Sequence, residues 1–448
     1  MNIEWKSILF VSITLIITLI LIKIIDKKLK LNGEIKRKIF HVSMGLIMLT
    51  FPYIFTSVLS VGILGIIAIC FLYFLRNTKL KDILGTALYS VERESMGEIF
   101  FAISVFLIFY LSKGNKILYS IPILILTFAD TAAALIGKNY GKKNLAELNE
   151  DSKSLEGSFM FFMVAFMATL VPLLLHTQVG REECLIISTI VGFNVALIEM
   201  ISHTGNDNLL IPLTTFALVA THIGLEVDYL RRNLLILGII FILVTIANRV
   251  KAWSKLALVE ILVTGYLTIT LYGTYAIIPP LLLLLTVMRF PKIRENEKNN
   301  LYDARIIETN IIIGIAICGI VAITGWNKEF FMIYATCYTM HLVVNTFVRL
   351  KYYLNKSESD SILIAISKGI AFVFIPSLIV QKIVFNEFIQ INMLILMILA
   401  VVLSALFICI KKKKTDVEEI SIHNGYIHTK IVFILTTIIS AIQFLQLA

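Results

Sequence analysis

The sequence predicts an all-α, polytopic integral membrane protein, and three properties lead to that prediction. Hydrophobic residues make up 58% of the 448 residues, above the share of roughly 45–50% in typical globular domains. Charged residues make up only 16%, where roughly 25% is usual. Apolar runs long enough to cross a bilayer recur along the whole chain. Together these properties exclude a soluble globular enzyme, a disordered chain and a coiled coil.

Each predicted span is an apolar run that approaches the roughly 20 residues a helix needs to cross the hydrocarbon core. We expect about 15–16 transmembrane helices from these runs. No small-residue cleavage site follows the first run, which favours a retained helix over a removed signal peptide. The predicted spans are residues 7–22, 40–55, 58–75, 99–112, 117–137, 157–176, 183–201, 209–225, 233–248, 256–272, 275–288, 306–324, 330–348, 362–380, 389–410 and 429–446.

The distribution of Lys and Arg among the loops predicts the orientation. If the N-terminus lies outside, 30 of these residues fall in inside loops and 8 in outside segments. Such an excess on one side is the positive-inside pattern. We therefore expect an integral protein of the cell membrane with its N-terminus outside. The net charge of +10 then reflects cytoplasmic loops near anionic lipid, and not nucleic-acid binding.

The five cysteines predict neither a zinc site nor a disulfide framework. They are scattered through apolar stretches, and none forms a Cys-x-x-Cys pair. The chemistry of the protein therefore has to come from other polar residues, and these are sorted by the side of the membrane on which they are expected.

Asp130 is the most informative polar residue, because it lies within the otherwise apolar run 121–136. A carboxylate inside a membrane is costly and is by default a functional candidate; its structural alternative is a partner to a buried polar group. Ala134, Gly137 and Gly141 share its helix face. A face with one acid and no bulk allows a ligand or another backbone to approach closely, and helix–helix packing is the alternative explanation for its small residues.

Two segments on the same predicted side precede Asp130 in the chain. Arg37 and Lys38 begin one span, where adjacent cations either grip phosphate oxygens or act as a plain positive-inside anchor. Glu98 closes the segment 92–98, whose three carboxylates and one Arg either hold a metal or a phosphate or form a solvated, self-neutralising loop.

Two further segments follow Asp130. Lys153 and Ser154 with Gly157 at a helix start suit anion binding, because free N–H groups and the helix dipole favour negative charge; the alternative is a Ser N-cap and a glycine packing site. Glu199 and the turn with Asp207-Asn208 offer oxygens of the kind that Mg²⁺ takes, or form a tight turn. Cations, carboxylates and glycines on one membrane face are the parts that phosphoryl transfer needs.

Taken in order, these motifs resemble the membrane lipid-alcohol kinases, the family that includes dolichol kinase, phytol kinase and CTP-dependent diacylglycerol kinase. The resemblance covers roughly residues 30–225, about half of the chain. The matching residues are Arg37, Lys38, His41, Gly45, Arg93, Gly97, Glu98, Asp130, Thr131, Ala132, Ala133, Gly137, Gly141, Lys153, Ser154, Glu156, Gly157, Ser158, Glu199, Asp207, Asn208 and Pro212.

The resemblance implies an enzyme that moves the γ-phosphoryl of a nucleoside triphosphate, commonly CTP, onto a lipid hydroxyl, with Mg²⁺ or another divalent cation. The expected acceptor is an isoprenoid alcohol of the phytol, dolichol or polyprenol type, or diacylglycerol, and the expected active site is on the cytoplasmic face. The implied catalytic residues are Asp130, Arg37, Lys38 and Glu98; nucleotide binding is assigned to Gly137, Lys138, Gly141, Lys142, Lys153, Ser154 and Gly157; and the candidate metal ligands are Asp130, Glu199, Asp207 and Asn208.

The resemblance also divides the chain and leaves two other functions open. Residues 1–225 are predicted to form a lipid-alcohol-kinase-like membrane domain, and residues 226–448 an additional multi-span domain of unassigned role. A CTP-dependent lipid-headgroup cytidylyltransferase would use a similar cation and acid site, but its long Lys/Arg/Asp/Gly signature near the C-terminus is missing. A multi-pass transporter fits the many spans, but transporter sites lie near the midplane, whereas these polar residues gather at one membrane face.

Overall fold

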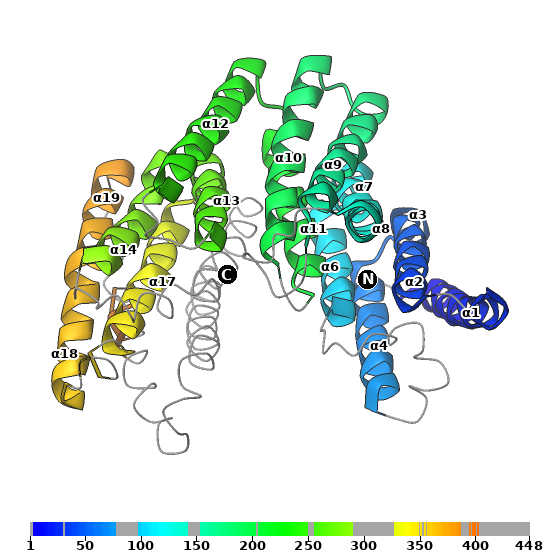
Figure 1. Cartoon of the computed structure of the whole chain (residues 1–448), viewed down its shortest axis with the longest axis horizontal. Helices are drawn as coiled ribbons and strands as arrows, with labels where there is room; N and C mark the ends of the chain where they lie inside the picture. Colours follow the sequence, from blue (N-terminus) through cyan, green and yellow to red (C-terminus); the bar gives the residue numbers. More distant parts are fainter. Residues whose placement is uncertain are drawn as a thin grey trace. The chain divides into compact units, whose positions relative to one another are not determined.

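The computed structural model describes residues 3–29, 32–77, 97–141, 153–202, 205–249, 255–289, 327–348, 350–351, 354 and 356–386, with fragments between 394 and 402. Regular structure in these ranges consists of helices, without strands. The predicted all-α class is therefore confirmed. Figure 1 shows the helices in chain order, from α1 in dark blue to α19 in orange.

The chain forms two compact units, Met1–Ile239 and Ile240–Ala448. The division falls inside α12 (Val227–Arg249), whereas the division predicted from the family resemblance falls just before that helix. The assignment of the kinase role to residues 1–225 and of a separate role to residues 226–448 stays a prediction.

The first unit contains every described residue of the predicted site. Its long α9 packs against both α8 and α10, and α11 packs against α6, α7 and α10. The elements are α1 (Trp5–Leu29), α2 (Gly33–Leu49), α3 (Phe51–Ile54), α4 (Val58–Asn77), α6 (Gly97–Ser112), α7 (Lys116–Leu124), the π-helical turn η2 (Ile125–Ala129), α8 (Asp130–Tyr140), α9 (Leu155–His176), α10 (Arg181–Ile201) and α11 (Asp207–His222).

The second unit has its own core around α17, where Phe331, Tyr334 and Phe347 are almost fully buried. Two polar residues of its apolar helices, Glu260 and His341, are among those that are buried. The elements that follow α12 are α13 (Lys255–Tyr272), η3 (Thr274–Ile277), α14 (Ile278–Arg289), α17 (Asn327–Val348), α18 (Glu358–Gly369), η6 (Ile370–Phe374) and α19 (Ile375–Phe385).

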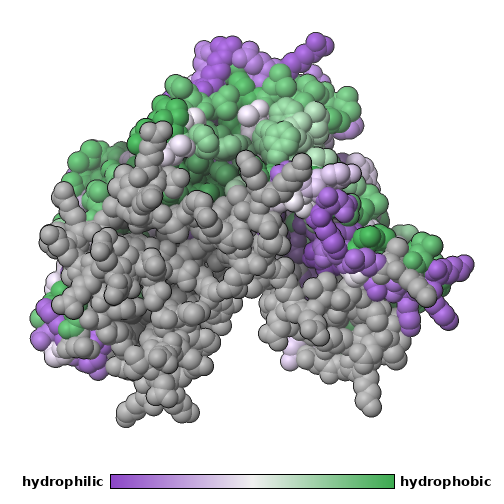
Figure 2. All heavy atoms as spheres, in the orientation of Figure 1, coloured by the Kyte–Doolittle hydropathy of each residue, from purple (hydrophilic) through white to green (hydrophobic). Residues whose placement is uncertain are grey.

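Seven helices of the described residues are long and apolar enough to cross a membrane, and each coincides with one predicted span. The predicted span 40–55 does not form one helix, because it is divided between α2 and α3 at Thr50. The predicted spans 306–324 and 429–446 lie outside the described residues, and 389–410 is described only in fragments. Large apolar side chains cover the outside of the helices, as at Leu9 and Phe10 of α1, which are each 62% exposed. Figure 2 shows wide apolar areas on the visible face, with hydrophilic residues gathered in separate groups. These features confirm a polytopic membrane protein.

Glycines set the close contact between α8 and α9, which frames one side of the predicted site. Gly137 and Gly157 face each other: a Cβ on Gly157 would lie 3.3 Å from the Gly137 Cα and 3.0 Å from the Ala133 carbonyl oxygen. Ser154 caps α9 by accepting the Gly157 N–H at 3.1 Å. The small residues therefore allow another backbone to approach, one of the two uses expected for this face.

Gly157→Leu is expected to lower the melting temperature of the purified protein. The added side chain would meet backbone atoms of Ala133 and Gly137, which move aside only if α8 and α9 separate. Overpacking of this kind costs about 1–3 kcal/mol. The matched control is Gly65→Leu on α4, because nothing lies within 4 Å of a Cβ there. Equal melting temperatures for the two variants would contradict the packing role of Gly157.

Candidate active site

Asp130, the first residue of α8, forms an ion pair with Lys38 of α2. Lys38 Nζ lies 2.7 Å from Asp130 Oδ2 and 3.3 Å from the Asp130 carbonyl oxygen. The Lys38 side chain is 4% exposed and that of Asp130 is 19% exposed. Each charge offsets the cost of removing the other from water. Two residues that the resemblance marks as essential therefore meet in space, although they are 92 positions apart in the sequence.

The helix that carries Asp130 has an irregular turn directly before it. The membrane span Lys116–Tyr140 is continuous, but Ile125–Ala129 adopts the π-helical form. Such turns are rare and are frequent at functional sites. His41 of α2 contacts this turn: its Nε2 lies 2.8 Å from the Leu126 carbonyl oxygen and 3.6 Å from Asp130 Oδ2.

Arg37 lies next to the pair but is turned toward the start of its own helix. Its guanidinium donates to the Glu34 carboxylate, with Nη2 2.7 Å from Oε1. Partial burial lowers the pKa of Arg37, but the Glu34 carboxylate and the charges of Asp130 and Asp207 outweigh it, so the pKa lies above its usual value. The guanidinium is therefore charged and acts on both Asp130 and Asp207.

Lys153 and Glu199 form a second ion pair, between the residue before the Ser154 cap and the end of α10. Lys153 Nζ lies 2.9 Å from Glu199 Oε1 and also donates to the Glu199 carbonyl oxygen. Burial lowers the pKa of Lys153, but Glu199 and then Asp207 outweigh it, so the pKa lies above its usual value. Asp130 contributes in the same direction. Lys153 is therefore a charged lysine held inside the protein.

The starts of α6 and α11 meet at the same site. Asn208 Nδ2 donates to the Gly97 carbonyl oxygen at 2.9 Å, and the Asn208 N–H donates to Asp207 Oδ1 at 3.1 Å. Glu98 lies in the first turn of α6, next to Gly97. Since Asp207 acts electrostatically on both Arg37 and Lys153, the segments predicted separately from the sequence form one group of charges.

The predicted nucleotide-binding residues other than Lys153 lie in different places. Gly137 and Gly157 lie in the contact between α8 and α9, and Gly141 ends α8 beside Ser154. Lys138 is exposed on α8, while Lys142 and the acidic segment before Gly97 lie outside the described residues. Nucleotide binding by these residues stays a prediction, and the part of it that rests on the 142–152 segment is not described by the structure.

A preformed metal cage is absent from the described residues, where no group of three or more His, Cys, Asp or Glu side chains is placed to hold an ion. Mg²⁺ is usually bound through one or two carboxylates together with substrate phosphates and waters. Glu199 Oε2 is buried and accepts no hydrogen bond from the described residues, so it is an available oxygen. The donor set of Glu199 and Asp207 therefore fits a cation that arrives with a nucleotide.

The resemblance includes His41 without assigning it a role, and the π turn was not predicted. Residues 125–129 contain neither Gly nor Pro, and Pro122 in the preceding turn is the nearest residue that disturbs a helix. A signal does exist in the spacing of Lys38, His41 and Gly45, which places all three on one face of α2. That face lies against the turn, since a Cβ on Gly45 would overlap the Thr127 side chain.

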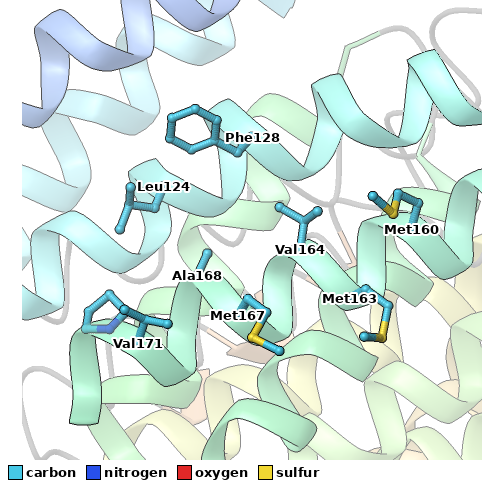
Figure 3. Close-up of a pocket in the computed structure, with 9 residues that line it drawn as sticks. Leu124, Phe128, Met160, Met163, Val164, Met167, Ala168 and Val171 are labelled. Carbon is cyan, nitrogen blue, oxygen red and sulfur yellow. The ribbon is translucent and has the colours of Figure 1, made fainter. Parts of the chain in front are cut away.

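A separate apolar groove of about 480 Å³ lies between the α7–η2 segment and α9. Figure 3 shows Leu124 and Phe128 on one wall and residues of α9 on the other. Asp130 follows Phe128 by two residues and so lies on the opposite side of the helix. The groove is therefore not the phosphate site. Its lining consists of Leu124, Phe128, Met160, Met163, Val164, Met167, Ala168, Val171 and Pro172.

Comparison with known proteins identifies a relative of the first half. The chain is 30% identical over 190 residues to the phytol kinase of Synechocystis sp.. The match covers 42% of this chain and 78% of the relative, and it lies in the N-terminal region. No family model matches the chain, and no solved structure matches it.

Lys153→Met is expected to destabilise the protein strongly, because it leaves the buried Glu199 carboxylate without a counter-charge. Removal of one partner of a buried ion pair costs about 3–5 kcal/mol. The double variant Lys153→Met, Glu199→Leu is expected to recover most of this loss, since two apolar side chains leave no unpaired charge. The melting temperature in detergent measures both effects.

The control for this comparison is Arg231→Met. Arg231 also forms an ion pair, with Glu182 at 2.7 Å, but both side chains are more than half exposed. Exposed pairs contribute little, so the melting temperature is expected to stay unchanged. A Lys153→Met protein as stable as the wild type would show that Lys153 and Glu199 are not a buried, mutually dependent pair.

Proposed function

The chain belongs to the polyprenol and phytol kinase-like family through its N-terminal region, and from this premise we propose that it is a membrane lipid-alcohol kinase. It transfers the γ-phosphoryl of a nucleoside triphosphate to the hydroxyl of an isoprenoid alcohol of the phytol, dolichol or polyprenol type, with CTP as the donor. Diacylglycerol is the alternative acceptor, because its hydroxyl presents the same reacting group.

The observation that carries this proposal is the Lys38–Asp130 pair, held 2.7 Å apart, with its carboxylate inside the apolar span Lys116–Tyr140. Arg37 and Lys153 add positive charge around it, and Glu199 and Asp207 add negative charge. Phosphoryl transfer is catalysed mainly by positioning and by charge stabilisation. A site with fixed cations for the phosphates and a carboxylate for the hydroxyl supplies both.

In the proposed reaction the oxygen of the lipid hydroxyl attacks the γ-phosphorus. The bond between that phosphorus and its bridging oxygen breaks, and the nucleoside diphosphate leaves. Asp130 orients the hydroxyl and accepts its proton, the role that a carboxylate has in the kinase template. Arg37, Lys38 and Lys153 face the negative charge of the phosphates. Glu199 and Asp207 would hold a divalent cation that arrives with the nucleotide, and that cation would supply further positive charge against the phosphates.

The position of the charges supports a kinase over the transporter alternative. Lys153 and Asp207 lie at the starts of α9 and α11. Together with Lys38 they belong to segments that the positive-inside pattern assigns to the cytoplasm. A soluble nucleotide meets a membrane lipid at such a place, whereas a transport site is expected near the midplane. The proposed active site therefore opens to the cytoplasmic face.

Asp130→Asn is expected to abolish phosphoryl transfer, because an amide cannot accept the hydroxyl proton. Loss of a general base lowers the rate by about 100- to 10,000-fold. The assay supplies membranes containing the protein with γ-labelled CTP or ATP, Mg²⁺, and phytol, farnesol, a polyprenol or diacylglycerol. Label in a lipid phosphate identifies donor and acceptor together.

Lys36→Met is the matched control for Lys38→Met in the same assay. Both lysines lie in α2 and both form ion pairs, but the partner of Lys36 is Asp26 at 3.1 Å. Lys38→Met is expected to lose transfer and Lys36→Met to retain it. Wild-type protein that labels none of the lipids would contradict the kinase proposal, and Asp130→Asn protein with wild-type activity would contradict the assignment of the site.

A further inference from the structure

The π turn before Asp130 receives contacts from its own helix and from outside it. Ile125–Ala129 contains neither Gly nor Pro, but Pro122 precedes it in the same helix and the Thr127 hydroxyl donates to the Ile123 carbonyl oxygen at 2.6 Å. The i→i+5 geometry is less favourable than the α-helix and is found mostly as single turns at functional sites. The turn is therefore expected to persist because neighbouring residues hold it.

One face of α2 provides such contacts. Lys38, His41 and Gly45 are spaced i, i+3 and i+7, which places them on one side of the helix. Lys38 bonds Asp130, and His41 Nε2 lies 2.8 Å from the Leu126 carbonyl oxygen inside the turn. Gly45 leaves room for the Thr127 side chain. This face of α2 therefore contacts Leu126, Thr127 and Asp130.

The contact fixes the chemical role of the imidazole. A ring nitrogen that bonds a carbonyl oxygen must carry the hydrogen, since the carbonyl can only accept. His41 Nε2 is therefore a donor to Leu126, and Asp130 Oδ2 at 3.6 Å is beyond direct hydrogen-bond distance. The other side of the ring packs edge-on against Phe101 of α6, with centroids 5.6 Å apart. Two helices thus hold the imidazole in place.

We infer that His41 is a positioning residue: by donating to the Leu126 carbonyl it maintains the π turn that directs the Asp130 carboxylate at Lys38. This inference rests on the proposed function, because Asp130 is the group whose position matters for transfer. His41 does not exchange a proton with the substrate. Its removal changes where the carboxylate lies and leaves Arg37 and Lys153, which pair with Glu34 and Glu199, in place.

The variants His41→Met and His41→Gln separate this role from simple packing. The two side chains have similar length, but only Gln keeps an N–H donor near the position of Nε2. His41→Met is expected to lower kcat by about 100-fold, the loss that a small misplacement of a reacting group causes. The KM for the nucleotide is expected to stay within a few-fold of the wild-type value. His41→Gln is expected to recover most of kcat.

His222→Met is the matched control. His222 is also buried and also bonds a backbone carbonyl, Leu218 O, at 2.7 Å, but it lies at the opposite end of α11 from Asp207. It is expected to retain wild-type kcat. Equal losses of kcat and melting temperature in His41→Met and His41→Gln would show a packing role and overturn the inference, as would full activity of His41→Met. An inactive wild type overturns the proposed function itself, and the inference with it.

Discussion

The structure of the site depends on the ion pair between Lys38 and Asp130. A carboxylate inside an apolar span is unfavourable unless an opposite charge accompanies it, and Lys38 supplies that charge at 2.7 Å. The pair joins α2 to α8 across 92 positions of the sequence, and Lys153–Glu199 joins the start of α9 to the end of α10 in the same way. Both pairs hold together helices that their apolar surfaces alone would not align, because hydrocarbon contacts in a membrane have little directional preference.

The π turn and the glycine contacts around the ion pair determine where the charged side chains lie. The π turn sets the rotation of α8 relative to α7, and α2 contacts that turn through His41 and Gly45. Gly137 and Gly157 bring α9 close enough for Lys153 to reach the same group of charges. An arrangement in which several helices each fix one charged residue is suited to a reaction that depends on position and electrostatics.

The fold class was predictable because it follows from composition and from apolar runs, which are properties of the chain read one segment at a time. The importance of Asp130 was also predictable, since a single acid in an apolar run stands out without any structure. The ion-pair partner of Asp130 was not predictable. Arg37, Lys38 and Lys153 are equivalent as charges in the sequence, and only the packing of α2 brings Lys38 to Asp130. The role of His41 and the π turn were missed for a related reason: the bond from His41 to the turn comes from another helix, and residues 125–129 contain neither Gly nor Pro.

The most direct measurement concerns the charge-reversed double variant Lys38→Asp, Asp130→Lys, compared with each single variant. If the pair is the catalytic centre, the double variant regains melting temperature relative to the single variants, because an ion pair is again present. Phosphoryl transfer to a lipid alcohol stays absent, because the carboxylate no longer lies where the hydroxyl binds. A double variant that regains both stability and transfer would contradict the catalytic role, and would show that the pair serves only to join α2 to α8.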